Sequence, residues 1–169
     1  MEIITKQDYQ KFIDCLYKLS SGEKFIAFQQ KIVNTKKIIV GVKTPELRKF
    51  AKKIYNSEHD GLFKYGENKN FEEVLVKGLV IGMHTDCDFA LQNLSKLVKS
   101  FDTWAETDMI CSSFKFFKGN EERLFEYFSK LAKSEEEFAS RFGIVCLMKY
   151  FLGENDICRT FNALDQVIC

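Results

Sequence analysis

Hydrophobic residues recur along this chain mostly at intervals of three and four residues, which places them on one side of an α-helix. The stretches between the periodic runs are short clusters of turn residues, and the chain contains one proline among 169 residues. Helix therefore accounts for nearly all of the chain. The pattern predicts helices at about residues 6–19, 22–33, 45–56, 71–84, 87–100, 103–118, 121–133, 135–152 and 155–168.

From Phe71 onward the predicted helices form successive pairs, at about 71–100, 103–133 and 135–168. A period of about thirty residues or slightly more is typical of helical-repeat proteins, in which each pair buries its apolar faces on the next. The sequence thus predicts an all-α fold, an α-solenoid of antiparallel helix pairs in a single domain over residues 1–169. Gly78 and Gly82 lie four residues apart on one helix, so we expect a neighbouring helix to approach closely there.

Three local signals refine this assignment. Thr44 followed by Pro45 predicts a helix cap with a first-turn proline, and Ser134 with Glu137 matches a capping box. The segment KKIIVGV (36–42) has the composition of a strand, but the sequence offers it no partner strand. We interpret it as a buried connection.

Composition narrows the class of protein. Hydrophobic residues make up 46% and charged residues 29%, which is typical of a soluble globular domain. No run approaches the roughly 20 apolar residues of a membrane span, and the start MEIITKQDYQ does not match a signal peptide. We therefore expect a cytoplasmic protein with no membrane contact.

Metal and disulfide chemistry find little support in the sequence. The six cysteines are scattered singly without a C-x-x-C pair, and we expect reduced core thiols rather than disulfides or zinc ligands. His59 and His84 are twenty-five residues apart, and no H-E-x-x-H motif is present. We therefore expect no metal site.

Basic residues are concentrated early in the chain, although the net charge is only +1. Seven basic residues and one acidic residue lie between positions 36 and 53. Thr44, as a cap, would leave backbone amides at a helix start where a phosphate could bind. This basic helix is either a solvated face or a phosphate-binding surface. Its candidate residues are Lys43, Thr44, Arg48, Lys49 and Lys52.

The only tryptophan stands in FDTWAETDMICSSFKFF (101–117). At 100° per residue, one side of the predicted 103–118 helix carries Trp104, Asp108, Ser112 and Lys115, and another carries Ile110, Phe114 and Phe117. Trp104 is either a boundary residue that shields its own helix or an aromatic surface. In the second case the indole and the carboxylate jointly face a cationic or electron-poor ligand.

The segment SEEEFASRFGIVCLMKYFLG (134–153) predicts a mostly buried helix that contains one arginine, Arg141. A buried guanidinium requires an anionic partner. That partner is either a neighbouring acid, Asp108 or Glu106, or a phosphate in a groove between repeats.

Four stretches in this order resemble the DNA alkylation repair family of AlkD-like alkylpurine DNA glycosylases, which are built from HEAT-like helical repeats. The similarity covers roughly residues 24–160. It runs through FQQKIVNTKKIIVGVKTPELRKFAKKI, FEEVLVKGLVIG, TWAETD and FASRFGIVCLMKYF.

The resemblance implies a basic concave surface that holds bent double-stranded DNA and removes cationic N3- or N7-alkylated purines by cleaving the glycosidic bond. It places Trp104 and Asp108 at the lesion, as catalytic residues, and Arg141 at the DNA backbone. Lys115 and the basic helix are expected to bind DNA as well. The reaction implies neither a cofactor nor a metal, and we expect a monomer.

Family members usually continue for another repeat or more, with a further aromatic near the lesion. We therefore expect residues 1–169 to lack the C-terminal repeat or repeats usual in the family. Phe28 is a candidate for the aromatic that some members place on an early helix. Two alternatives to catalysis remain: a non-catalytic HEAT-like module that binds DNA, and a scaffold for protein interactions.

Overall fold

The computed structural model describes residues 1–112 and 114–167, which contain helices and no β-strand. The all-α class predicted from the hydrophobic spacing is therefore confirmed. The helices are α1 (Lys6–Lys18), α2 (Glu23–Ile32), α3 (Thr44–Tyr55), α4 (Asp60–Lys64), α5 (Phe71–Met83), α6 (Cys87–Leu97), the 3₁₀ turn η1 (Val98–Ser100), α7 (Trp104–Ile110), α8 (Glu121–Ala132), α9 (Glu137–Tyr150) and α10 (Ile157–Leu164).

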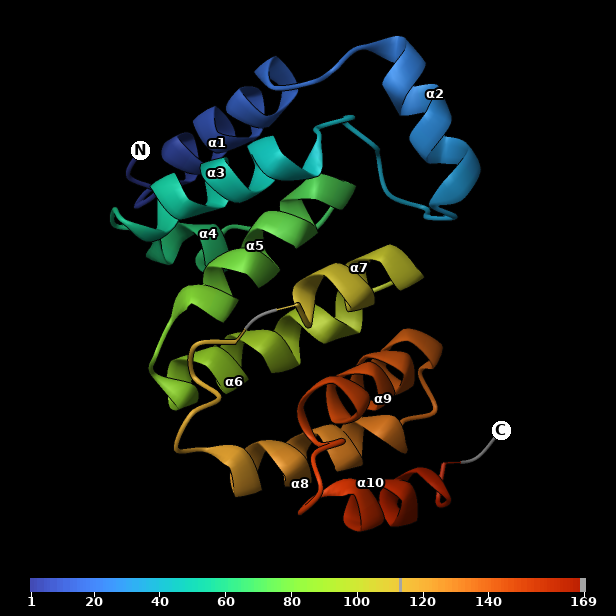
Figure 1. The fold of residues 1–169 in the computed structure, drawn as a ribbon. Coiled ribbons are helices and arrows are strands. Elements are labelled where there is room, and N and C mark those ends of the chain that lie inside the picture. The colour runs from blue at the N-terminus through green and yellow to red at the C-terminus, as the bar shows by residue number, and fades with distance from the viewer. Residues whose placement is uncertain (113, 168–169) are drawn as a thin grey trace.

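The helices stack in successive layers, with the N-terminus at one end of the stack and the C-terminus at the other (Figure 1). One row of neighbouring helices runs α3, α5, α7, α9, each packed on the next. Helix α6 packs on α5, and α8 packs on α9. This arrangement is that of an α-solenoid, as the repeat period predicts.

The pairing within the stack differs from the prediction in its middle. Residues 103–133 were expected to form one helix pair, but α7 packs between α5 and α9, and α8 packs chiefly on α9. Helix α4 was not predicted, because a helix of only five residues has too few positions to show a period.

Helix α7 ends at Ile110, so the predicted 103–118 helix is wrong beyond its second turn. Phe114 and Phe116 are both buried, and residues two apart cannot share one face of an α-helix. The backbone instead bonds to other helices: the N–H of Phe114 donates to the Tyr150 hydroxyl, and the N–H of Lys115 donates to the Gly82 carbonyl. Residue 113, which this prediction included, lies outside the described residues.

Both predicted caps are also wrong. Thr44 is the first residue of α3, and its side chain does not cap the helix, although Pro45 does lie in the first turn. The Ser134 hydroxyl accepts a hydrogen bond from the N–H of Glu136, one residue before α9 begins at Glu137. The reciprocal bonds of a capping box are therefore not made at this helix.

The segment 36–42 is a largely buried connection, as predicted, with Ile39, Val40 and Val42 in the core. It contributes only an isolated bridge between Ile38 and Asn70. The buried carboxylate of Glu72, in the first turn of α5, accepts hydrogen bonds from the N–H groups of Val40 (2.9 Å), Gly41 (2.7 Å) and Val42 (3.2 Å). These bonds replace the strand partner that the segment lacks.

Helix α7 crosses α5 at Gly78, where a Cβ atom would lie 2.4 Å from Ile110 Cγ1. The close approach predicted from the glycine spacing is therefore confirmed at this position. It brings α7 down onto α5, so that the residues of α7 on the opposite side face outward.

Cys87, Cys111 and Cys146 are buried free thiols, as expected. Cys15 is half-buried and Cys158 is exposed, so the expectation of core positions is wrong for these two, and Cys169 lies outside the described residues. Cys15 lies at the edge of the apolar face of α1, and Cys158 lies outside the apolar face of α10. Among residues 1–112 and 114–167, no helix has the length and apolar character needed to span a membrane.

Candidate functional site

Trp104 and Asp108 lie one turn apart on α7 and both reach the surface. Trp104 is 43% exposed and the Asp108 side chain is 39% exposed. Ala105 and Ile110 are buried on the other side of the helix. The shared polar stripe predicted for these two residues is therefore present, within a helix shorter than expected.

Arg141 reaches Asp108 from α9, the next helix in the row. Its Nη2 lies 3.1 Å from Asp108 Oδ1 and 2.9 Å from Oδ2, and its Nε lies 3.2 Å from Oδ1. Of the two predicted partners, the structure selects the neighbouring acid Asp108, whereas Glu106 faces inward. The Arg141 side chain is 44% exposed, so the predicted burial of this arginine is wrong.

The Thr107 hydroxyl contacts both members of this ion pair. Its buried hydroxyl lies 2.7 Å from the Trp104 carbonyl and 2.9 Å from Asp108 Oδ1, and it accepts a hydrogen bond from Arg141 Nε. A hydroxyl that bonds to both partners restricts the rotamers of both side chains. Thr107 was not singled out in the sequence analysis.

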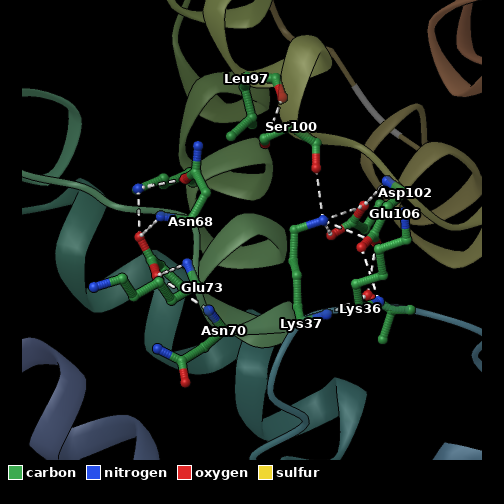
Figure 2. Close-up of polar contacts among 12 residues, drawn as sticks. Lys36, Lys37, Asn68, Asn70, Glu73, Leu97, Ser100, Asp102 and Glu106 are labelled. Carbon is green, nitrogen blue, oxygen red and sulfur yellow. Dashed lines mark hydrogen bonds and ion pairs between the residues drawn. The ribbon is translucent and has the colours of Figure 1, made fainter. Parts of the chain in front are cut away.

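A buried lysine fixes the start of α7. Lys37 Nζ donates to the Ser100 carbonyl (2.6 Å) and forms ion pairs with Asp102 (2.8 Å) and Glu106 (3.0 Å) (Figure 2). Glu106 also accepts from the backbone N–H of Asp102. Burial raises the pKa of Glu106 to about 7, against the lowering effects of that N–H and of Lys37.

The sequence analysis counted Lys37 with the surface basic residues, but its side chain is only 8% exposed. For Glu106 a sequence signal was available: Thr103-Trp-Ala-Glu106 matches the S/T-x-x-E pattern of a helix start. The sequence offered no equivalent signal for Lys37, because its partners lie more than sixty residues away.

A second buried network lies at the start of α5, on the other side of Figure 2. The Glu73 carboxylate accepts from the Tyr9 hydroxyl, from Lys77 Nζ (2.6 Å) and from the N–H of Asn68 (2.8 Å). These groups satisfy one another, and they fasten α1 and the 65–70 turn to α5. Their role is structural.

The basic helix α3 reaches the same region through one contact. Arg48 Nη2 donates to Ser112 Oγ (3.1 Å), just after the end of α7, and so Arg48 and Arg141 both contact the segment 104–112. Lys115 is exposed, and its Nζ lies 5.6 Å from the centre of the Tyr55 ring at the end of α3.

The remaining predicted binding residues lie at the surface. Lys43, Thr44, Lys49 and Lys52 are exposed, and Lys49 pairs with Glu46 on its own helix. Phe28, on α2, is 57% exposed. Helix α2 has no buried residue, so its aromatic side chains are available at the surface.

This arrangement can attract anions and hold a carboxylate beside an aromatic ring. Within residues 1–112 and 114–167, no three histidine, cysteine or acidic side chains come together as metal ligands. The groups available at the site are therefore an indole, a carboxylate and two guanidinium groups on neighbouring helices.

A family model described as DNA alkylation repair enzyme matches residues 15–168. The match spans α2 through α10 and includes every candidate residue named above. Neither the curated proteins nor the solved structures gave a match to this chain.

Proposed function

Because the chain belongs to the DNA alkylation repair enzyme family, we propose that it hydrolyses the N-glycosidic bond of cationic N3- or N7-alkylated purines in double-stranded DNA. One observation carries this proposal: Trp104 and Asp108 face outward from the same side of α7, with Arg141 on the neighbouring α9 and Arg48 of α3 contacting Ser112 just after α7. A carboxylate on a DNA-binding surface repels the DNA phosphates, so it is unfavourable there unless the reaction requires its charge.

Asp108 stabilises the sugar as the bond breaks. The C1′–N bond cleaves with its electron pair going to the base, which neutralises the positive charge of the alkylated ring. The sugar becomes an oxocarbenium-like cation, and water adds to C1′ and loses a proton. A carboxylate fixed beside C1′ favours this transition state over the ground state, and Trp104 contacts the electron-poor sugar or base.

Arg141 links DNA binding to the exposure of Asp108. Its guanidinium group is occupied by both carboxylate oxygens, and the two non-bridging oxygens of a DNA phosphate can accept the same hydrogen bonds. When a phosphate takes some of these hydrogen bonds, the carboxylate loses them and its charge becomes available to the sugar. Thr107 keeps the carboxylate oriented during this exchange.

The remaining predicted DNA-binding residues, cationic except for Thr44, contact the DNA backbone near the lesion. Arg48 and Lys115 lie next to α7, and Lys43, Thr44, Lys49 and Lys52 extend this surface along α3. Such contacts hold the duplex in register without reading its sequence.

The test is base release from methylated duplex DNA by the Asp108→Asn variant. Asparagine keeps the size of the side chain and one hydrogen-bond acceptor for Arg141, but it removes the charge. We expect release of 7-methylguanine or 3-methyladenine to fall by about a hundredfold or more, whereas DNA binding is retained. Asp14→Asn, an exposed change on α1, is the matched control and should leave release unchanged. Equal release by Asp108→Asn and the unaltered protein would exclude this role.

A second candidate function is a non-catalytic DNA-binding module, and the closed Asp108–Arg141 pair favours it, because the carboxylate then needs no other partner. In that case no base is released. Asp108→Asn would then bind DNA at least as tightly as the unaltered chain, because a negative charge is removed from the binding surface.

A further inference from the structure

The two histidines of the chain face each other across two loops, away from α7. His59 directly precedes α4 and His84 directly follows α5. Their Nε2 atoms lie 2.9 Å apart, and both side chains are partly buried. No step of the proposed reaction uses either ring.

The hydrogen bonds of His59 determine its tautomer. Its Nδ1 lies 2.5 Å from the Ser57 carbonyl oxygen, which can only accept, so Nδ1 carries the proton. The Nε2 lone pair of His59 therefore points at His84, whose Nε2–H donates to it. A histidine whose Nδ1–H is held by a backbone carbonyl and whose Nε2 is free is the usual form of a metal-ligating imidazole.

Aromatic neighbours hold the His84 ring in this orientation. The ring stacks on Phe89 at 4.1 Å between centroids, and the Tyr55 ring meets it edge-on at 5.1 Å. Burial lowers the pKa of His84, with a smaller contribution from His59. The His84 ring is thus packed between two aromatic side chains.

The surroundings of the pair select a cation over an anion. The cavity next to the two rings has a volume of about 810 Å³, and the acidic side chains that line it are Glu2, Glu58 and Asp60. These three carboxylates disfavour a phosphate and attract a positive ion. Asp86 adds a further negative charge near His84.

From the facing Nε2 atoms, we propose that His59 and His84 bind one divalent transition-metal ion of the Ni²⁺, Cu²⁺ or Zn²⁺ class. With metal–nitrogen distances of about 2.0–2.1 Å, nitrogens 2.9 Å apart subtend an angle of about 90° at the metal. That angle matches square-planar or octahedral geometry, which favours Ni²⁺ and Cu²⁺ over tetrahedral Zn²⁺.

Binding requires a change of tautomer at His84 and a turn of the two rings, because lone pairs that point along the Nε2–Nε2 line do not meet at one ion. His84 gives up its Nε2 proton to solvent and takes one up at Nδ1, so each ring stays neutral and offers the metal an Nε2 lone pair. Since no third protein ligand joins the pair within the described residues, water completes the coordination. The bound ion would tie the loop before α4 to the loop after α5, both of them outside the α7 site.

The test is titration of the untagged chain with NiCl₂ in a calorimeter. The exposed Cys158 and the last residue of the chain, Cys169, are replaced by serine in every protein to reduce competition from thiols. We expect one ion per chain. His59→Gln and His84→Gln should each weaken binding by about tenfold or more, since each removes one of two protein ligands. Glu126→Gln, an exposed change on α8, is the control and should bind as the parent does.

A second measurement guards against variants that fail to fold. Nitrogen NMR of the unaltered chain resolves both imidazoles, because it contains only two histidines. Added Zn²⁺ should shift the Nε2 resonances of both rings together, with the His59 Nδ1 proton retained. Unperturbed resonances at saturating metal, or nickel binding that both histidine variants retain in full, would overturn the proposal.

Discussion

The guanidinium group of Arg141 on α9 contacts both carboxylate oxygens of Asp108 on α7, with Nη2–Oδ1 and Nη2–Oδ2 distances of 3.1 and 2.9 Å. The pair joins two neighbouring helices of the solenoid, and roughly two-fifths of each side chain remains exposed. The Asp108 carboxylate is therefore neither buried in the core nor unpaired. It is held at the surface by a group that a phosphate can compete for.

Arg141→Gln should affect DNA binding more than folding. A half-exposed ion pair contributes at most about 1 kcal/mol to the free energy of unfolding, because water screens it. If Arg141 binds a DNA phosphate, the slope of log K against log salt concentration should fall by about 1. Urea unfolding and DNA titrations at several salt concentrations measure the two effects. A large loss of stability with an unchanged salt slope would assign Arg141 a structural role only.

The basic helix α3 makes a separate prediction. Arg48→Gln and Lys52→Gln should each weaken binding to duplexes of any sequence and reduce the salt slope by about 1, because each removes one phosphate contact. Lys130→Gln, an exposed change on α8 at the other end of the stack, is the matched control (Figure 1). If all three variants change binding equally, the attraction is due to overall charge and not to this helix.

Gly78→Ala should destabilise the protein by separating α5 from α7. The added Cβ would lie 2.4 Å from Ile110 Cγ1, so the buried Ile110 side chain or the helix that carries it must shift. Overpacking of this kind costs about 1–3 kcal/mol. Thermal unfolding measures the loss. Gly153→Ala, where no atom lies within 4 Å of the added Cβ, should unfold like the parent; equal melting temperatures for all three proteins would contradict the close approach.

Glu106 should make the stability of the protein depend on pH. Its pKa is raised from 4.5 to about 7 in the folded state, so the folded state holds the proton more tightly than the unfolded state. The stabilising contribution is complete below pH 4.5 and is lost as the pH rises to about 7. The two pKa values correspond to a loss of about 3 kcal/mol.

The matched variant for this effect is Glu106→Gln, which has no proton to lose. Between pH 4.5 and 7.5 the free energy of unfolding of the parent should fall relative to that of this variant. His84, whose pKa is lowered, titrates in the same range in both proteins and cancels in the difference. Parallel curves for the two proteins would show that Glu106 is ionised throughout.

Periodicity alone was enough to identify the helices that have a long apolar face. In α3 and α8, buried residues recur every three or four positions along several turns, so the sequence itself indicates which side is covered. The outward positions of Trp104 and Asp108 followed from the same argument, since they lie four residues apart on the side opposite Ile110. The TWAETD and TPELR stretches also indicate the family from the sequence alone.

Tertiary contacts decided what the local sequence could not. Helix α7 ends at Ile110 because Tyr150 and Gly82 bind the backbone that follows it, and both are distant along the chain. Long-range partners likewise turned Lys37 inward, paired Arg141 with Asp108 and brought His59 to His84. A periodic pattern reports which face of a helix is buried, whereas the partner of a charged side chain depends on how distant helices pack.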